Sequence, residues 1–347
     1  MSEATVREAF VKQAAWGRKL EAPFSAMLFE TLGRIIDGPT AIGGRVLSWL
    51  GDPLADAVPL RLAGGLHALV RAGDLPELAA LYPPNAMPAT ASLAAALVTV
   101  LADAALGARL LPWLDSAPQT NEVGRSGVLM PGMLTIAAAC RLPLRLFELG
   151  ASAGLNLRMD AYAYRFGELA LEPPGAPLTL APAWEGPAPP AGPITVIERR
   201  GVDLNPIDLR DLAARERLLA YVWPEQLERT ARLEAAMTAF AADPAPLDRG
   251  DAAAWVVRHV APLTGTATVV YHSIAWQYFP AATQAAITAH LTAVGASATA
   301  DAPLAWLRYE FESAAAPPTL RLRRWPGGGD HRLAEAHPHG ASVRWCG

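Results

Sequence analysis

The chain has 347 residues, of which 52% are hydrophobic and 18% are charged, and it carries a formal net charge of −4. A chain of this length and apolar content can bury a large core, in two domains or in one decorated domain. The slightly acidic balance gives no support for nucleic acid or a membrane as the main partner, and it favours a small-molecule substrate. It leaves the oligomeric state open.

Signals for targeting and for metal binding are weak. The first residues include acids and lack the apolar core of a signal peptide. The most apolar stretch, residues 91–102, ends at Asp103 and is shorter than the roughly 20 residues that cross a bilayer. The two cysteines, Cys140 and Cys346, have no metal or redox spacing, and three histidines near the C-terminus lack further ligands. We therefore expect a cytoplasmic protein with no metal.

Apolar residues recur at helical spacing through the first 115 residues. Val6 and Phe10 fall on one helical face, as do Phe24, Leu28 and Leu32 in the next segment. Turn signals separate further helical stretches, and no convincing strand pattern occurs among them. The sequence predicts a helical N-terminal domain over residues 1–116, which would act as a cap on the substrate side.

From about residue 117 the pattern changes to alternating strands and helices. The strand-like runs lie at residues 144–149, 194–206, 266–271, 304–311, 320–325 and 341–345. This alternation predicts an α/β domain over residues 117–347 with a Rossmann-like, mostly parallel sheet, and the last two runs predict an antiparallel C-terminal hairpin. A proline-rich insertion at about residues 165–193 suits a surface hairpin or loop.

The most informative segment is a strand followed by a glycine-spaced turn. Residues 144–149 end in Glu148-Leu149, and Gly150-Ala151-Ser152-Ala153-Gly154 follow, ahead of a helical stretch. Strand, tight turn and helix place backbone N–H groups against a nucleotide-like ligand. The same five residues also spell G-x-S-x-G, the nucleophile elbow of serine hydrolases, which would make Ser152 a nucleophile with His337 or His339 in its triad. Because no strand pattern precedes residue 144, we keep the hydrolase only as an alternative.

Acids lie at the ends of three successive predicted strands. Glu148 comes two residues before Gly150, Asp203 ends the next strand with Glu198 as its alternative, and Asp251 follows a third turn in Gly-Asp-Ala. In this order and context the segments resemble class I S-adenosylmethionine-dependent methyltransferases. The resemblance implies that Asp203 contacts the ribose and that Asp251 contacts the adenine. The implied cofactor site comprises Asn121, Arg125, Glu148, Gly150, Ala151, Ser152, Gly154, Asn156, Asp203, Asp251 and Ala252.

His272 directly follows the strand-like run at 266–271, at the edge where open α/β sheets bind ligands. An unperturbed imidazole has a pKa of about 6.5, which suits a general base for a hydroxyl, thiol or carboxyl acceptor. Trp276 and Tyr278 would then line the substrate pocket. A purely structural role for His272 is the alternative, as is a non-catalytic Rossmann-fold binding or scaffold protein.

The full pattern also resembles a bacterial family known as domain of unknown function 2332, which brings no established activity. The segments that carry this resemblance are 119–122, 147–157, 200–206, 222–226, 271–273, 276–278 and 338–340, together with Trp345.

Overall fold

The computed structural model describes residues 2–313 and 316–347. The chain divides into two compact units, which we call the helical unit and the sheet unit. The helical unit comprises Met1–Thr120 and Asp211–Ala231, and the sheet unit comprises Asn121–Arg210 and Arg232–Gly347. The polypeptide therefore enters the helical unit a second time after it has begun the sheet unit.

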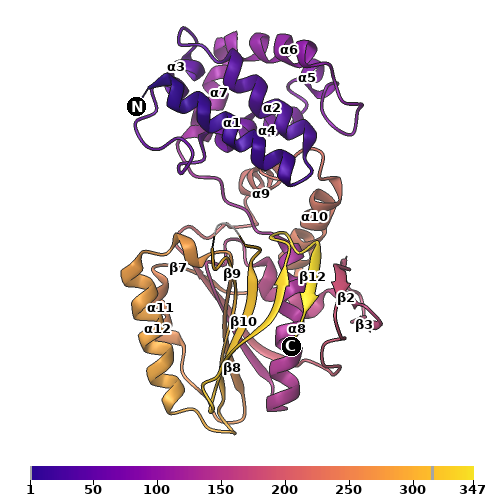
Figure 1. The fold of residues 1–347 in the computed structure, drawn as a ribbon, viewed down its shortest axis with the longest axis vertical. Helices are drawn as coiled ribbons and strands as arrows, with labels where there is room; N and C mark the ends of the chain where they lie inside the picture. The colour runs from indigo at the N-terminus through magenta and orange to yellow at the C-terminus, as the bar shows by residue number, and fades with distance from the viewer. Residues whose placement is uncertain (1, 314–315) are drawn as a thin grey trace. The chain divides into compact units, whose positions relative to one another are not determined.

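The described residues of the helical unit form helices and no strands. The helices are α1 (Glu3–Lys19), α2 (Pro23–Ile35), α3 (Ala41–Leu47), α4 (Val58–Arg71), α5 (Pro76–Ala79), α6 (Thr90–Ala102), α7 (Ala104–Leu114) and α9 (Leu212–Ala220) (Figure 1). Their apolar faces meet in one core that includes Phe10, Leu28 and Leu62, all fully buried or nearly so. The side chains of Ser2, Thr40 and Asp103 cap α1, α3 and α7.

Hydrogen bonds hold the returning segment, residues 211–231, to the N-terminal helices. The Glu225 carboxylate accepts the backbone N–H of Ser25 at 2.8 Å and its hydroxyl at 2.7 Å, and it thereby satisfies a donor in the first turn of α2. His67 of α4 lies 3.1 Å through Nδ1 from the carbonyl oxygen of Ala220. The predicted α/β domain over residues 117–347 includes α9, whereas these contacts hold α9 among the helices.

The sheet unit alternates strands and helices. Its first half contains η1 (Val123–Arg125), α8 (Ser126–Cys140), β1 (Leu144–Leu149), η2 (Leu155–Ala161), β2 (Ala163–Phe166), β3 (Leu169–Leu171), β4 (Thr179–Leu180), β5 (Ala183–Glu185) and β6 (Val196–Asp203). Its second half contains β7 (Leu247–Arg249), α11 (Ala252–His259), β8 (Ala267–Ser273), η3 (Trp276–Tyr278), α12 (Ala281–Ala296), β9 (Leu304–Glu310), β10 (Thr319–Trp325), β11 (Asp330–Ala336) and β12 (Ser342–Trp345). Helix α10 (Leu227–Ala242) begins in the helical unit and ends in the sheet unit.

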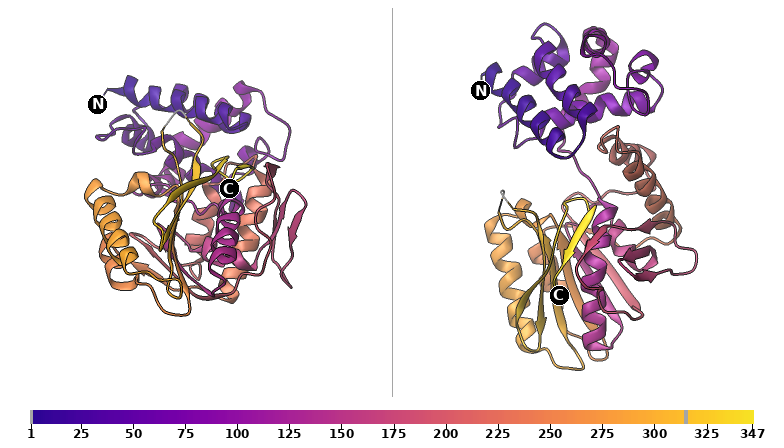
Figure 2. Two further views of the ribbon diagram at one scale, coloured as in Figure 1. Left: turned by 60° about the horizontal axis from the view of Figure 1, so that its bottom comes forward. Right: turned by 45° about the vertical axis from the view of Figure 1, so that its right-hand side comes forward.

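The main sheet has nine strands in the order β5-β12-β11-β10-β9-β8-β1-β6-β7. The five strands β7-β6-β1-β8-β9 are parallel, and the chain order reverses between β1 and β8, as in doubly wound folds. Helices α11 and α12 lie on one face of this sheet and α8 lies on the other (Figures 1 and 2). The prediction of an α/β fold with a Rossmann-like sheet is confirmed.

The C-terminal strands differ from the predicted hairpin. Strand β10 pairs antiparallel with β11, and β11 pairs antiparallel with β12, so the last strands form a three-stranded meander. The predicted pairing of 320–325 with 341–345 is wrong because β11 lies between them. Residues 330–336 read Asp-His-Arg-Leu-Ala-Glu-Ala, which contains no β-branched residue and no Phe, Tyr or Trp, so their strand propensity is low.

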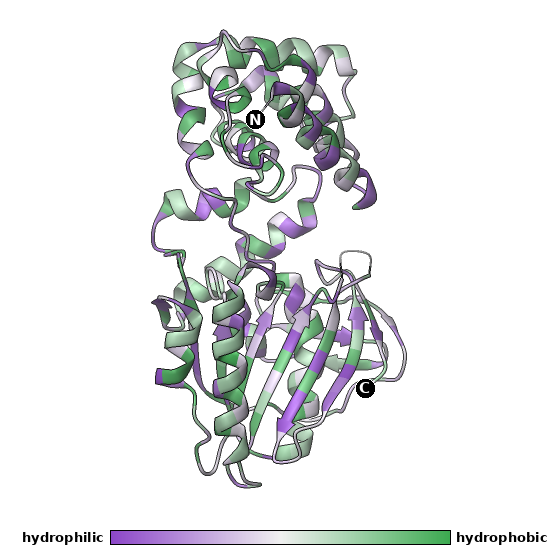
Figure 3. Cartoon of the chain, turned by 60° about the vertical axis from the view of Figure 1, so that its left-hand side comes forward, coloured by the Kyte–Doolittle hydropathy of each residue, from purple (hydrophilic) through white to green (hydrophobic). Residues whose placement is uncertain are grey.

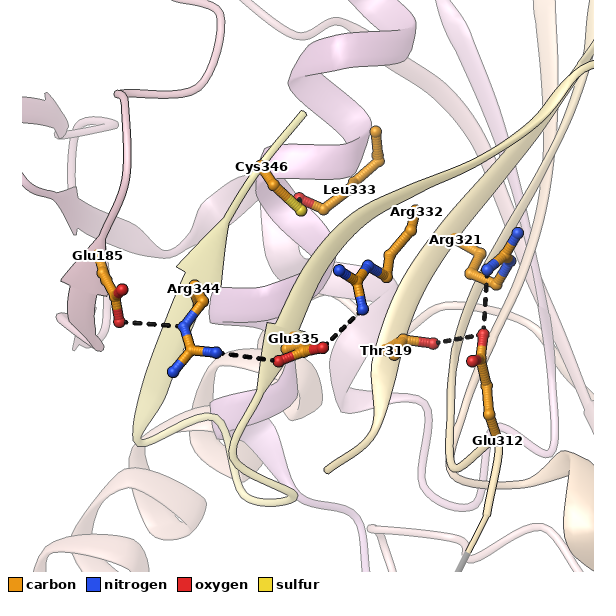
Figure 4. A network of polar contacts seen from close by, with 9 residues as sticks. All are labelled: Glu185, Glu312, Thr319, Arg321, Arg332, Leu333, Glu335, Arg344 and Cys346. Atoms are coloured by element: carbon orange, nitrogen blue, oxygen red, sulfur yellow. Dashed lines mark hydrogen bonds and ion pairs between the residues drawn. The ribbon is translucent and has the colours of Figure 1, made fainter. Parts of the chain in front are cut away.

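The proline-rich insertion contributes strands to two sheets. Strands β2, β3 and β4 form a small separate sheet, and β5 pairs parallel with β12 at the edge of the main sheet. There Arg344 bonds Glu185 at 3.1 Å and Glu335 at 3.2 Å, so ion pairs bridge β5, β12 and β11 (Figure 4). The insertion thus covers an edge of the main sheet that would otherwise be open for pairing.

By length and composition alone, Val123–Cys140 could cross a membrane, and Thr90–Ala102 with Ala104–Leu114 would form a second, bent candidate. However, 67% of the first window is buried inside the protein. A Cβ added at Gly132 of α8 would lie 2.7 Å from the side chain of Leu307 in β9. The apolar character of α8 is therefore accounted for by close packing on the sheet.

Candidate functional site

The turn after β1 has an unusual backbone. Gly150, Ser152 and Gly154 have φ values of +69°, +54° and +75°, a region that glycine enters freely and other residues enter rarely. A Cβ at Gly150 would lie 2.7 Å from the Cβ of Ala275, in the segment after β8. Glycine at this position therefore allows two strand-end segments to approach closely at the switch point of the sheet.

The backbone N–H groups of Gly150, Ala151 and Ser152 donate hydrogen bonds to acceptors within the protein. Gly150 and Ala151 both donate to the carbonyl oxygen of Val202, at 2.9 and 3.0 Å. Ser152 donates to the Asp203 carboxylate at 2.9 Å. The turn is thus tied to the end of β6 by three hydrogen bonds, and these three N–H groups already have acceptors.

The Asp203 carboxylate organises the end of β6. The second carboxylate oxygen accepts the backbone N–H of Asn205 at 2.8 Å. The main-chain carbonyl oxygen of Asp203 accepts the N–H of Gly250, which follows β7. The next side chain, Leu204, is 62% exposed, so the strand end presents a carboxylate beside an apolar surface.

Asp251 begins α11 as its N-cap. One carboxylate oxygen accepts the N–H groups of Ala253 and Ala254, at 3.0 and 3.1 Å, and the other accepts the hydroxyl of Thr283 at 3.2 Å. Ala252 is buried. Asp251 therefore lies at the same sheet edge as Asp203, and it also caps α11.

Glu148 is a buried acid under the turn. Burial, the largest influence, raises its pKa to about 8, and the nearby Asp203 charge adds to this. The Tyr271 hydroxyl lies 3.4 Å from its carboxyl and 3.3 Å from the carbonyl oxygen of Asn156. Glu148 therefore holds its proton at neutral pH and belongs to a buried network with Asn156, which also accepts the hydroxyl of Ser126 at 2.7 Å.

The segment before α8 contacts both sides of the switch point. The Asn121 side-chain oxygen accepts the N–H of Leu155 at 2.9 Å, just after the turn. Arg125 donates to the carbonyl oxygen of Ser273 at 2.9 Å and to that of Pro338 at 3.2 Å. Both side chains therefore make contacts that hold the protein's own backbone.

His272 lies on the opposite sheet face from Glu148 and is fully buried. Its Nδ1 lies 2.6 Å from the Glu310 carboxylate, and its Nε2 accepts the indole N–H of Trp306 at 3.2 Å. Both ring nitrogens are therefore occupied. A general base needs a free nitrogen within reach of the substrate, and this arrangement offers none at His272.

Glu310, at the end of β9, is a site residue that the sequence pattern did not predict. The carboxylate oxygen that contacts His272 also accepts the N–H groups of Ala275 and Trp276, at 3.0 and 3.2 Å. The Trp276 ring stacks on the imidazole at 4.8 Å, whereas Tyr278 is 75% exposed. The sequence feature that could have indicated Glu310 is an acid at the end of a fourth strand. Glu310 and His272 together fix the segment that packs against Gly150.

The Ser152 hydroxyl is buried and has no hydrogen-bond partner in the described part of the chain. A nucleophilic serine needs a base bonded to its hydroxyl, with a third group that orients the base. No such pair reaches Ser152. Among the described residues, no group of three or more His, Cys, Asp or Glu side chains could hold a metal ion.

The sheet order, the turn after β1 and the acids at successive strand ends define an α/β protein with a Rossmann-like sheet. A family model described as an uncharacterized protein conserved in bacteria, domain of unknown function 2332, matches residues 7–345. The chain belongs to this bacterial family. Comparisons with curated proteins and with solved structures give no match.

Proposed function

We propose that the sheet unit binds S-adenosylmethionine at the turn formed by residues 150–154, and that the protein is a methyltransferase for a small-molecule acceptor. The observation that carries the proposal is the placement of Asp203 and Asp251 at the carboxyl ends of adjacent strands, beside a turn held closely to them. Open α/β sheets bind their ligands at this edge, next to the switch point.

The hydrogen bonding of the turn favours a nucleoside without phosphates. A dinucleotide site needs backbone N–H groups that point at a pyrophosphate. Here the N–H groups of Gly150, Ala151 and Ser152 already donate hydrogen bonds to Val202 and Asp203. The carboxylates of Asp203 and Asp251 would also repel phosphate, whereas they suit ribose hydroxyls, an adenine amino group and a positively charged sulfonium.

Two further groups fit the same ligand. The Ser152 hydroxyl is a buried polar atom that lacks a partner, which a bound ligand would supply. Leu204 exposes an apolar side chain next to Asp203, where an adenine ring would bury it. Asp203 would accept the ribose hydroxyls, and Asp251 would accept from the adenine amino group with the capacity left by its capping role.

In this proposal His272 is a positioning residue. Together with Glu310 it holds the segment that packs against Gly150, and this segment would shape the acceptor side of the proposed ligand site. When bound, S-adenosylmethionine supplies an electrophilic methyl group for a hydroxyl, thiol or carboxyl acceptor.

Isothermal titration calorimetry with S-adenosylmethionine, S-adenosylhomocysteine and NAD⁺ tests the proposal on the full chain. We expect the first two ligands to bind and NAD⁺ not to bind. Leu204→Ala should lower the affinity for S-adenosylhomocysteine by about 3–10-fold, because an apolar contact is lost. Leu212→Ala, at an exposed leucine of α9, should leave this affinity unchanged. Folded protein that binds neither adenosyl ligand would overturn the proposal.

A further inference from the structure

An open groove lies on the sheet face that carries His272, away from the turn after β1. Its volume is about 1090 Å³, and it is lined by residues of α12 and of strands β8 to β11. Figure 3 shows this region, where the open strands carry alternating hydrophilic and hydrophobic residues. We call it the α12 groove.

The wall of the α12 groove is long and is lined by small side chains. The lining residues of α12 run from Ala281 to Ala293, which corresponds to about 18 Å of helix. Ala285, Ala289 and Ala293 repeat every four residues, so they share one face of the helix, and all three are exposed. These methyl groups leave room between helix and sheet, and the partly exposed Trp276 extends the apolar lining.

The sheet side of the groove is charged, and most of its charges are paired. Asp330 of β11 bonds Arg308 of β9 and lies 3.2 Å from Nε of Arg321 in β10. Arg321 also bonds Glu312 at 3.1 Å (Figure 4). Glu310 is satisfied by His272 and by two backbone N–H groups. The three carboxylates of the groove therefore each have donors.

Arg323 is the exception among these charges. It lines the groove, and its guanidinium lies 4.6 Å from the centre of the Trp325 ring. Within residues 2–313 and 316–347 its buried Nε–H has no acceptor and it forms no ion pair. A guanidinium stays charged at all ordinary pH values and presents a planar set of donors that matches an oxyanion. The groove thus combines one arginine whose Nε–H has no acceptor with a long apolar wall.

We propose that the α12 groove binds an elongated amphipathic anion, whose oxyanion head group pairs with Arg323 and whose apolar chain lies along the alanine face of α12. Pairing would supply the acceptors that the guanidinium lacks, and the chain would cover the exposed methyl groups of α12. The proposal does not depend on binding of S-adenosylmethionine, because residues 150–154, Asp203 and Asp251 do not line the groove.

Binding of decanoate and of decanol to the full-length protein tests the proposal, measured by displacement of the fluorescent dye 8-anilinonaphthalene-1-sulfonate. The two ligands share a chain length and differ in the charge of the head group. We expect decanoate to bind at least tenfold more tightly than decanol, since a hydrogen bond to a charged group contributes about 1.5–3 kcal/mol. Arg323→Gln should remove this preference.

Matched variants separate the groove from the rest of the surface. Arg324→Gln changes the next residue of β10, on the other sheet face, and should leave decanoate binding unchanged. Ala289→Trp fills the groove from an exposed helix position and should abolish decanoate binding, whereas Ala286→Trp, at an exposed position outside the lining, should not. Equal affinities for decanoate and decanol, no binding of decanoate, or binding that survives Ala289→Trp would overturn the proposal.

Discussion

Asp203 accepts the backbone N–H of Ser152 at 2.9 Å, although the two residues lie 51 positions apart in the chain. This bond joins the end of β6 to the turn after β1, and the same carboxylate also holds Asn205. One side chain therefore fixes two loops at the sheet edge where the adenosyl ligand is proposed to bind.

Asp203→Asn should weaken both the loop and the ligand site. The amide retains one acceptor oxygen but loses the negative charge and the second acceptor. We expect the free energy of unfolding of the sheet unit to fall by about 1–3 kcal/mol, measured by urea denaturation, and S-adenosylhomocysteine affinity to fall more than tenfold by calorimetry. Asp208→Asn is the control, because Asp208 is exposed and its side chain bonds Arg210 alone among residues 2–313 and 316–347. Equal effects of the two substitutions would contradict the role of Asp203.

Gly150→Ala should destabilise the fold through backbone conformation and crowding. The φ of +69° disfavours alanine, and the added Cβ would lie 2.7 Å from that of Ala275. We expect a cost of about 1–3 kcal/mol, read from chemical denaturation. Gly250→Ala adds the same methyl group at a neighbouring strand end, where no atom lies within 4 Å, and should cost less. A comparable loss in both variants would show that crowding at the switch point is unimportant.

The buried carboxyl of Glu148 should make stability depend on pH. Its pKa is raised to about 8 in the folded protein, against about 4.3 in an unfolded chain. The unfolded state therefore releases this proton first, and the sheet unit should lose stability as the pH rises from about 4.3 to 8. Glu148→Gln removes this titration. The midpoint temperature of its thermal unfolding, relative to that of the natural protein, should therefore rise across that pH range. A constant difference would contradict the raised pKa.

His67 should have the opposite pH dependence in the helical unit. Burial lowers its pKa to about 4, against about 6.5 in an unfolded chain. The unfolded state takes up the proton first as the pH falls, so stability is lost between pH 6.5 and 4, by about 3 kcal/mol in total. His67→Gln should flatten this decline in thermal unfolding curves. A slope that persists in the variant would assign the acid sensitivity to other groups.

Glu225→Gln should loosen α2. The carboxylate accepts both the N–H and the hydroxyl of Ser25 in the first turn of that helix, where a negative charge is favourable. We expect the helical unit to lose about 1–2 kcal/mol, measured by denaturation followed through helical circular dichroism. Glu228 lies three residues further on and is exposed, so Glu228→Gln should lower the stability of the helical unit by a small fraction of that amount. Identical stabilities for the two variants would rule out the cap.

The sequence predicted those parts of the fold that depend on local patterns. The strands β1, β6, β8 and β9 are short apolar or β-branched runs, and the turn between Gly150 and Gly154 follows from residues that tolerate positive φ. Strand β11 was missed because its residues have low strand propensity and are held by neighbours on both sides.

The functional neighbourhood of His272 could not be predicted because it depends on long-range partners. Glu310 and Trp306 come from β9, 38 and 34 residues away, and the parallel pairing of β8 with β9 brings them to the imidazole. The position of α9 was missed for a similar reason, since tertiary contacts with His67 and Ser25 decide which unit the returning segment joins.

The second passage of the chain through the helical unit constrains the order of synthesis. Ser25 and His67 emerge from the ribosome long before Ala220 and Glu225, the residues to which they bond. The first seven helices must therefore wait, with an apolar surface uncovered, while β1 to β6 are translated. Neither unit can be completed before the other has begun, so nascent chains that stall before residue 231 should depend on chaperones.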